Sequence, residues 1–79
     1  MITKNTYKID IEGELERINR DIDDMEEAGM EQIVLDFFGG SENEREFIFA
    51  ARAAVKARGY AAVREYDDGD LVLIIRKAA

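Results

Sequence analysis

The chain has 79 residues, of which 47% are hydrophobic, eighteen are acidic and eleven are basic, giving a net charge of −7, and it contains no cysteine and no histidine. This composition excludes disulfides, thiolate nucleophiles, the common zinc sites and the commonest general base. We therefore expect one small domain over residues 1–79 that is not an enzyme and uses no metal or cofactor. The sequence shows neither a signal peptide nor a membrane-spanning segment, so the cytoplasm is the expected compartment.

Hydrophobic periodicity predicts three elements in the first half of the chain. Thr6–Ile11 alternates apolar and polar side chains, as a half-buried strand does. Apolar residues at spacings of three and four then predict a helix over Glu14–Ala28, which Gly29 ends. The nearly apolar run Gln32–Phe38 predicts a second strand.

The second half predicts a helix followed by a hairpin. Ser41 and Glu44 have the spacing of a capping box at the start of a second helix, and Gly59 is placed to end it. Tyr60–Tyr66 and Asp70–Lys77 predict two strands that a tight turn joins. Because the last strand contains an unbroken apolar run, we expect it to be central in the sheet.

This order predicts an α/β two-layer sandwich, β-α-β-α-β-β, with a mixed sheet and two helices on one face. The arrangement resembles the fold shared by the C-terminal domain of translation initiation factor three, the Alba chromatin proteins and the TusA-like sulfur carriers. The resemblance implies a four-stranded sheet of order 1-2-4-3 whose last strand is antiparallel to the others. The open face would then carry Val34, Phe38, Val72 and Ile74, an apolar patch that a dimer or a partner could cover.

The residues that give the TusA-like family its activity are missing from this chain. The resemblance to that family lies in Asp10, Gly13 and the ending Ile75–Lys77. Glu16 and Arg17 stand where the family has its sulfur-bearing cysteine and the following proline. A carboxylate cannot carry a persulfide, so sulfur transfer is excluded.

The net charge argues against direct binding of nucleic acid and of anionic membranes, both of which attract basic surfaces. The segment that resembles Alba proteins supports this, because Gly40, Ser41 and Glu42 stand where those proteins carry lysines that hold nucleic acid. We therefore expect a basic partner.

Acidic residues are concentrated in one part of the chain. Residues 10–46 hold fourteen of the eighteen acids and only three arginines, a local net charge of −11. The predicted first helix holds seven of these acids, or one per about 3 Å of helix, close to the spacing of phosphates along a nucleic-acid strand. The same helix has i,i+4 pairs of Glu16 with Arg20 and of Arg17 with Asp21. Such pairs are typical of an ordinary solvated helix, so a binding surface and a solvated surface both stay open.

Size, charge and the lack of catalytic groups resemble the small acidic anti-CRISPR and anti-restriction proteins of phages. The resemblance implies an inhibitor or decoy that mimics DNA in the bacterial host cell and binds a basic nucleic-acid-binding protein such as a CRISPR effector complex. Phe49 would be an apolar anchor beside the acids, or would pack against the chain termini. The predicted partner-binding residues are Glu16, Asp23, Asp24, Glu27, Glu31, Glu42, Glu46 and Phe49.

The alternative function is that of a catalytically empty TusA-like or Alba-like structural domain that forms a homodimer through its apolar sheet face. That function predicts self-association that salt does not weaken, whereas a decoy complex should weaken steeply with salt. A third interpretation, a computationally designed domain, agrees less well with the uneven charge.

Overall fold

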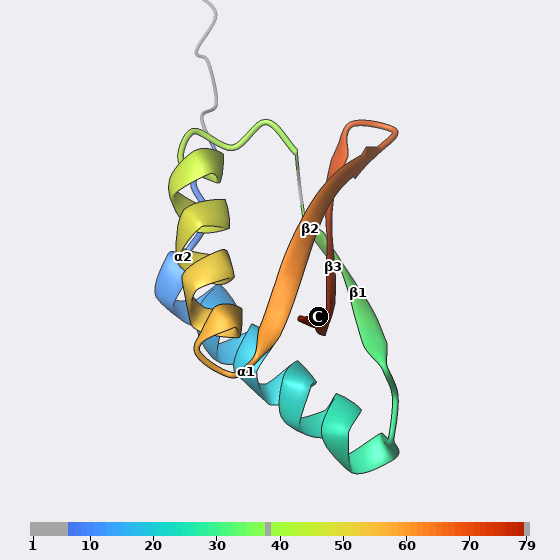
Figure 1. Ribbon diagram of the computed structural model, residues 1–79. Coiled ribbons are helices and arrows are strands. Elements are labelled where there is room, and N and C mark those ends of the chain that lie inside the picture. The colour runs from blue at the N-terminus through green and yellow to red at the C-terminus, as the bar shows by residue number, and fades with distance from the viewer. Residues whose placement is uncertain (1–6, 38, 79) are drawn as a thin grey trace, which may run out of the picture.

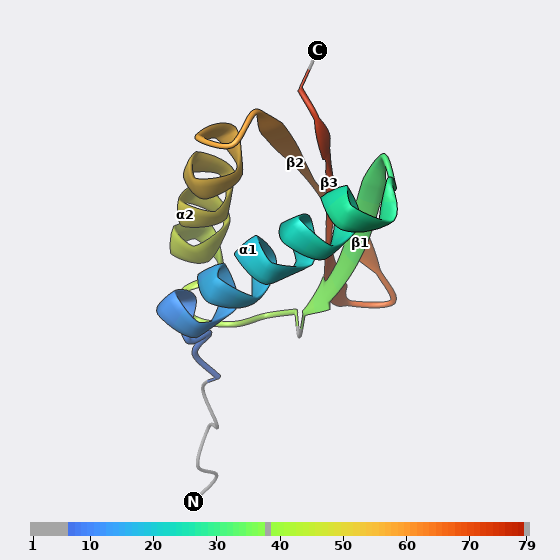
Figure 2. The same cartoon turned by 90° about the horizontal axis from the view of Figure 1, so that it is seen from below.

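The computed structural model describes residues 7–37 and 39–78 of the chain. Within this part, three strands form an antiparallel sheet in the order β1-β3-β2, so that β1 and β2 are its edges. Two helices lie on one side of the sheet, and Figures 1 and 2 show the two layers from perpendicular directions. The predicted two-layer arrangement of helices and strands is therefore confirmed. The elements are α1 (Ile11–Ala28), β1 (Gln32–Phe37), α2 (Glu44–Lys56), β2 (Tyr60–Asp67) and β3 (Asp70–Lys77).

The predicted first strand is wrong for the residues that are described. Tyr7–Asp10 belongs to no strand, and α1 begins at Ile11, three residues earlier than expected. Asp10 is the N-cap of α1, and its carboxylate accepts a hydrogen bond of 3.3 Å from the amide of Gly13. Residues 7–37 and 39–78 thus form three antiparallel strands in place of the four-stranded mixed sheet of order 1-2-4-3, and their element order is α-β-α-β-β. Thr6, the expected start of that strand, lies outside the described residues.

Asn43 supplies the hydrogen bonds that a neighbouring strand would have given to this segment. Its Oδ1 accepts from the Ile9 amide at 2.8 Å, and its Nδ2 donates to the Ile9 carbonyl at 2.9 Å. The Tyr7 carbonyl accepts from the amide of Glu42 at 2.8 Å. Ile9 is buried in the core, so its main-chain groups need these partners. The alternating pattern therefore reflects one anchored isoleucine and not a strand.

The use of Asn43 by Ile9 also changes the start of α2. Asn43 is the N-cap residue but makes no side-chain capping hydrogen bond, and the helix begins at Glu44. The predicted capping box of Ser41 with Glu44 is wrong, because the Ser41 hydroxyl oxygen is buried without a hydrogen-bond partner. Glu44 instead accepts a hydrogen bond of 3.3 Å from the amide of Gly40.

β3 is the central strand, as its apolar run predicted, and its register separates two faces. On the inner face, Leu73 pairs with Leu35 of β1 and Arg64 of β2, and Leu73 is fully buried beneath the helices. On the outer face, Ile74 lies between Val34 and Val63. Phe38, which was also expected on the outer face, lies outside the described residues. The largest fully buried side chains of the core are Phe47, Ile18, Ile22, Met25, Leu71, Leu73, Ile75 and Val55.

Left-handed backbone conformations end α1 and close the hairpin, as the sequence predicted. Gly29 follows α1 with φ 70°, a conformation that glycine adopts without steric cost. Asp68 and Gly69 have φ values of 51° and 84°, as a two-residue turn of type I′ requires. This turn joins β2 directly to β3.

Replacing Asn43 with alanine should lower the free energy of unfolding by about 1–3 kcal/mol, because the main-chain groups of the buried Ile9 lose both partners. Chemical denaturation followed by circular dichroism measures this change. Ser41→Ala is the matched control and should cost less than about 0.5 kcal/mol, because its hydroxyl makes no hydrogen bond. Equal losses in the two variants would contradict the role given to Asn43.

Candidate functional site

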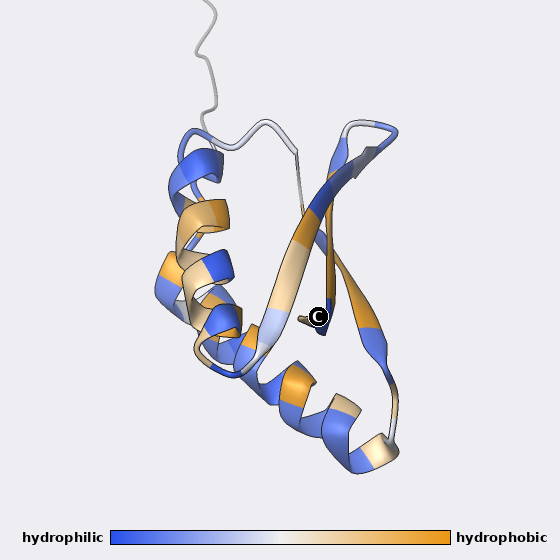
Figure 3. Ribbon diagram, in the orientation of Figure 1, coloured by the Kyte–Doolittle hydropathy of each residue, from blue (hydrophilic) through white to orange (hydrophobic). Residues whose placement is uncertain are grey.

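The candidate site is the outer face of α1, opposite the buried stripe of this amphipathic helix. We call this face the acidic ridge and define it by the five residues named at the end of this paragraph, all of which are exposed. Figure 3 shows α1 as mainly hydrophilic, with separate apolar residues along its length. A helix with one apolar stripe presents its other side to solvent, which places the ridge where a partner can reach it. The ridge consists of Glu16, Arg20, Asp23, Asp24 and Glu27.

All eight residues predicted to bind a partner have exposed side chains, but they lie in three separate places. Four are on the acidic ridge, and Glu31 lies in the loop before β1. Glu42, Glu46 and Phe49 lie on α2 or immediately before it. The structure therefore divides the predicted site and does not gather it around one pocket.

Arg58, in the turn after α2, neutralises part of the acidic helix. Its Nη2 lies 2.6 Å from Oδ1 of Asp23 and 3.1 Å from Oε1 of Glu26. Its Nη1 donates a hydrogen bond of 3.0 Å to the main-chain carbonyl of Asn19. The hydrogen bond with Asp23 is the main cause that raises the pKa of Arg58, and partial burial opposes it. Asp23 is thus both a predicted partner-binding residue and an internal ion-pair partner.

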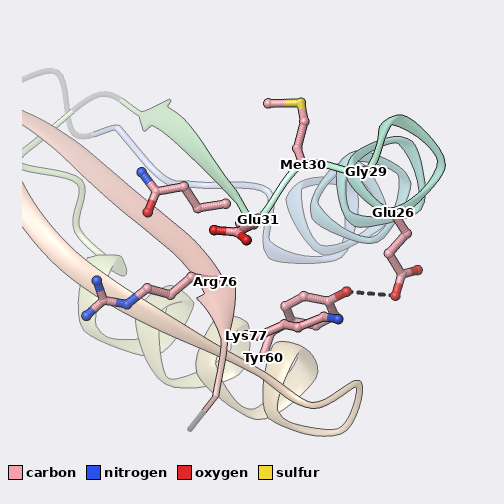
Figure 4. Close-up of a pocket in the computed structure, with 8 residues that line it drawn as sticks. Glu26, Gly29, Met30, Glu31, Tyr60, Arg76 and Lys77 are labelled. Carbon is pink, nitrogen blue, oxygen red and sulfur yellow. Dashed lines mark hydrogen bonds between the residues drawn. The ribbon is translucent and has the colours of Figure 1, made fainter.

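Tyr60 strengthens the same contact from the start of β2. Its hydroxyl donates a hydrogen bond of 2.7 Å to Oε2 of Glu26, as Figure 4 shows. This hydrogen bond, followed by desolvation of the buried ring, raises the pKa of Tyr60 above its ordinary value. Both residues line an open hollow of 740 Å³ that also carries opposite charges on Glu31, Arg76 and Lys77. No charge of one sign dominates there.

Arg17 fixes the other flank of α1. Its guanidinium lies 3.2 Å from Glu14 and 3.8 Å from Asp21, and its central carbon lies 5.2 Å from the centre of the Phe37 ring. The predicted pair of Arg17 with Asp21 is therefore confirmed. The predicted pair of Glu16 with Arg20 is absent from the ion pairs of residues 7–37 and 39–78.

Three acids of the ridge stay unpaired between these two neutralised flanks. Glu16, Asp24 and Glu27 take part in no ion pair within the described part of the chain. These three residues lie on the side of α1 opposite its buried residues, so their carboxylates point away from the core. The negative charge that α1 offers to a partner is therefore smaller than the seven acids of the predicted first helix suggest.

Phe49 is 79% exposed, and no described segment covers it. The sequence placed it beside acids, and Glu46 does precede it by one turn of α2. The hollow that Phe49 lines is nevertheless basic, because Arg45, Arg52 and Arg64 line it as well. Sequence reasoning missed this cluster because Arg64 comes from β2, and helical spacing alone cannot reveal a residue from another element.

No protein-family model, no curated protein and no solved structure matches this chain. Over residues 7–37 and 39–78, no helix is both long and apolar enough to cross a bilayer. No group of three or more carboxylates in the same residues is arranged to hold a metal ion. The surface carries unpaired carboxylates on α1 and, on α2, a phenyl ring that lies among arginines of α2 and β2.

The hydroxyl of Tyr60 should ionise at a higher pH in the folded protein than in the unfolded chain, where the pKa is about 10. Folding raises this pKa, so the stabilisation that the hydrogen bond of Tyr60 with Glu26 gives the folded protein is fully present below a pH of about 10. This stabilisation is lost as the pH rises through the pKa of Tyr60 in the folded protein. Absorbance of tyrosinate during an alkaline titration measures this. Tyr60→Phe should remove a late-ionising component.

A second tyrosine serves as the control for this titration. Tyr66 donates a hydrogen bond to Glu44, which is the main cause that raises its pKa. Tyr66→Phe should therefore remove a different late component and leave that of Tyr60. If the component lost in Tyr60→Phe ionises at the ordinary value of about 10, the hydrogen bond to Glu26 is not present in solution.

Proposed function

We propose that this protein is a non-enzymatic inhibitor or decoy that presents the acidic ridge of α1 to a basic nucleic-acid-binding protein, such as a CRISPR effector complex or a restriction enzyme. The observation that carries the proposal is the set of unpaired, exposed carboxylates of Glu16, Asp24 and Glu27. Exposed charges of one sign attract a partner of opposite sign and accelerate its association. The ridge therefore suits the lysines and arginines of a nucleic-acid site.

The ion pairs on the flanks of α1 support this function by making the ridge rigid. Arg58 holds the C-terminal half of the helix and Arg17 holds the middle, so these parts of α1 are already ordered when a partner binds. A surface that is already ordered loses less conformational entropy on association. The acids that Arg58 and Arg17 engage thus position the helix, and the unpaired ridge acids Glu16, Asp24 and Glu27 remain for the partner.

The spacing of the unpaired acids favours competition for basic residues over a close copy of a nucleic-acid strand. Glu16 and Glu27 are separated by eleven residues, which is roughly 17 Å of helix. With Asp24, this gives about one free carboxylate per 6 Å, fewer than the phosphates along one strand of DNA. The decoy would therefore act by occupying a basic patch, with Glu31 extending the ridge towards β1.

Reversing two charges on the ridge should abolish the inhibition. We expect Asp24→Lys with Glu27→Lys to weaken binding at least about tenfold, because two attractive contacts become repulsive. Neither residue is in an ion pair of the described chain, so the fold should stay intact. The assay is displacement of labelled duplex DNA from purified effector complexes and restriction enzymes at low and high salt.

Asp67→Lys with Asp70→Lys is the matched control, since it makes the same change in net charge at the hairpin turn. This control should keep its inhibition. Wild-type inhibition should also fall as salt rises, because salt screens exposed charges. Full inhibition by the Asp24→Lys, Glu27→Lys variant would refute the decoy function.

A second candidate function, that of a structural subunit, is supported by the uncovered face of the sheet. Val34, Ile74 and Val63 form a row across all three strands there, and Val34 is 54% exposed. At one end of this face Val72 lies between Asp36 and Glu65, and Arg76 lies towards the other end. A twofold axis along the apolar row would place each Arg76 near the acids of a second copy, so the face is self-complementary in charge.

If this face forms a homodimer, Val34→Lys should convert the dimer to a monomer, because a charge would be buried in the centre of the interface. Light scattering after size-exclusion chromatography measures the mass. Met30→Lys is the control, because Met30 is also an exposed apolar residue, at 56%, but lies outside the row. A wild-type protein that stays monomeric at high concentration would exclude this function.

A further inference from the structure

A basic hollow of 330 Å³ lies on the outer side of α2, where this helix meets β2. Its lining combines three arginines with one phenyl ring, in a protein whose net charge is −7. Four of the five lining residues are exposed, so packing of the core does not explain the cluster. The lining residues are Arg45, Ile48, Phe49, Arg52 and Arg64.

Two of the arginines are oriented by contacts with neighbouring groups. Nε of Arg52 donates a hydrogen bond of 3.4 Å to the main-chain carbonyl of Ala62. The guanidinium carbon of Arg64 lies 5.8 Å from the centre of the Tyr66 ring, and the Tyr66 hydroxyl is itself hydrogen-bonded to Glu44. An arginine fork that is already oriented loses less freedom when it binds an anion.

None of the three arginines of the hollow is in an ion pair within the described chain. The ion pairs of residues 7–37 and 39–78 involve Arg17 and Arg58, and none of them includes Arg45, Arg52 or Arg64. At physiological salt the field of an exposed charge fades within about 8 Å, so local charges govern what approaches the hollow. This part of the surface therefore attracts anions in spite of the negative net charge.

We propose that the hollow binds an acidic peptide segment of a partner protein, with carboxylates on the arginines and an apolar side chain on Phe49. Guanidinium groups bind carboxylates with two parallel hydrogen bonds, which makes the contact both strong and directional. An exposed aromatic ring among arginines has the composition of an interface hot spot. The charge and the ring thus specify the same type of ligand, an acidic segment with one apolar residue.

The surroundings of the hollow favour a short peptide over the other possible anions. A long polyanion such as single-stranded nucleic acid would continue along α2 and meet Glu46 and Glu42, which are both exposed. The acidic ridge of a second copy is also unsuitable, because all five of its residues are charged and none would cover Phe49. This proposal uses α2 and β2 and does not depend on the decoy function of α1.

The test is fluorescence anisotropy with a short labelled peptide that carries three glutamates beside one phenylalanine. We expect Arg45→Glu with Arg64→Glu to weaken binding at least about tenfold, and Phe49→Ala to weaken it about fivefold or more. Arg45→Glu alone is the safeguard against misfolding, since Arg45 makes no hydrogen bond or ion pair within the described chain. Lys8→Glu, which makes the same change in charge outside the hollow, should bind as the wild type does.

Control peptides, control variants and a competing oligonucleotide each give a result that supports or overturns the proposal. Peptides with glutamine in place of glutamate, or alanine in place of phenylalanine, should bind at least about fivefold more weakly. Equal weakening by Lys8→Glu and by Arg45→Glu would show attraction without a site and would overturn it. So would tighter binding of a single-stranded oligonucleotide than of the peptide, or an oligomer that Arg45→Glu dissociates, since the occupant would then be nucleic acid or a second copy.

Discussion

Arg58 holds the acidic helix α1 against the turn that leads from α2 into β2. An acidic helix of eighteen residues has to cover part of a three-stranded sheet in a small acidic chain. Like charges on such a helix oppose folding, and acids near its C-terminal end are opposed by the helix dipole as well. Arg58 meets Asp23, Glu26 and the Asn19 carbonyl at this end, and it does so from the turn that leads into β2. One side chain thereby connects α1 to the turn between α2 and β2.

The sequence predicted the elements that local patterns determine and failed where a distant side chain decides. The hairpin, the central position of β3 and the end of α1 at Gly29 follow from turn residues and hydrophobic periodicity. The first strand was predicted wrongly, because the side chain of Asn43 makes the hydrogen bonds to Ile9 that a neighbouring strand would make. Asn43 lies 34 positions from Ile9 in the sequence, so no local pattern reveals this contact. The start of α2 was misplaced for the same reason, since Asn43 is used by Ile9.

The candidate site shows the same division between local and distant information. Exposure of the acids on α1 could be predicted, because a helix with one apolar stripe must present its remaining residues to solvent. Their pairing could not, since Arg58 is 35 positions away from Asp23. The basic surroundings of Phe49 were missed because Arg64 arrives from β2. The fold thus places charges that are distant in sequence side by side: Arg58 reaches the acids of α1, and Arg64 of β2 joins two arginines of α2.

The edges of the sheet give the negative charge a consequence for solubility. β1 and β2 each have one side without a strand neighbour in the described sheet, and β2 is eight residues long. Free strand edges are templates for pairing between molecules, and repulsion between like-charged molecules keeps such edges apart in solution. The sequence pI is about 4.5, so acidification towards this value removes the repulsion while the edges remain. Storage in acidic buffer would therefore favour precipitation of this protein by pairing between the strand edges of different molecules, and near-neutral buffers would keep it dispersed.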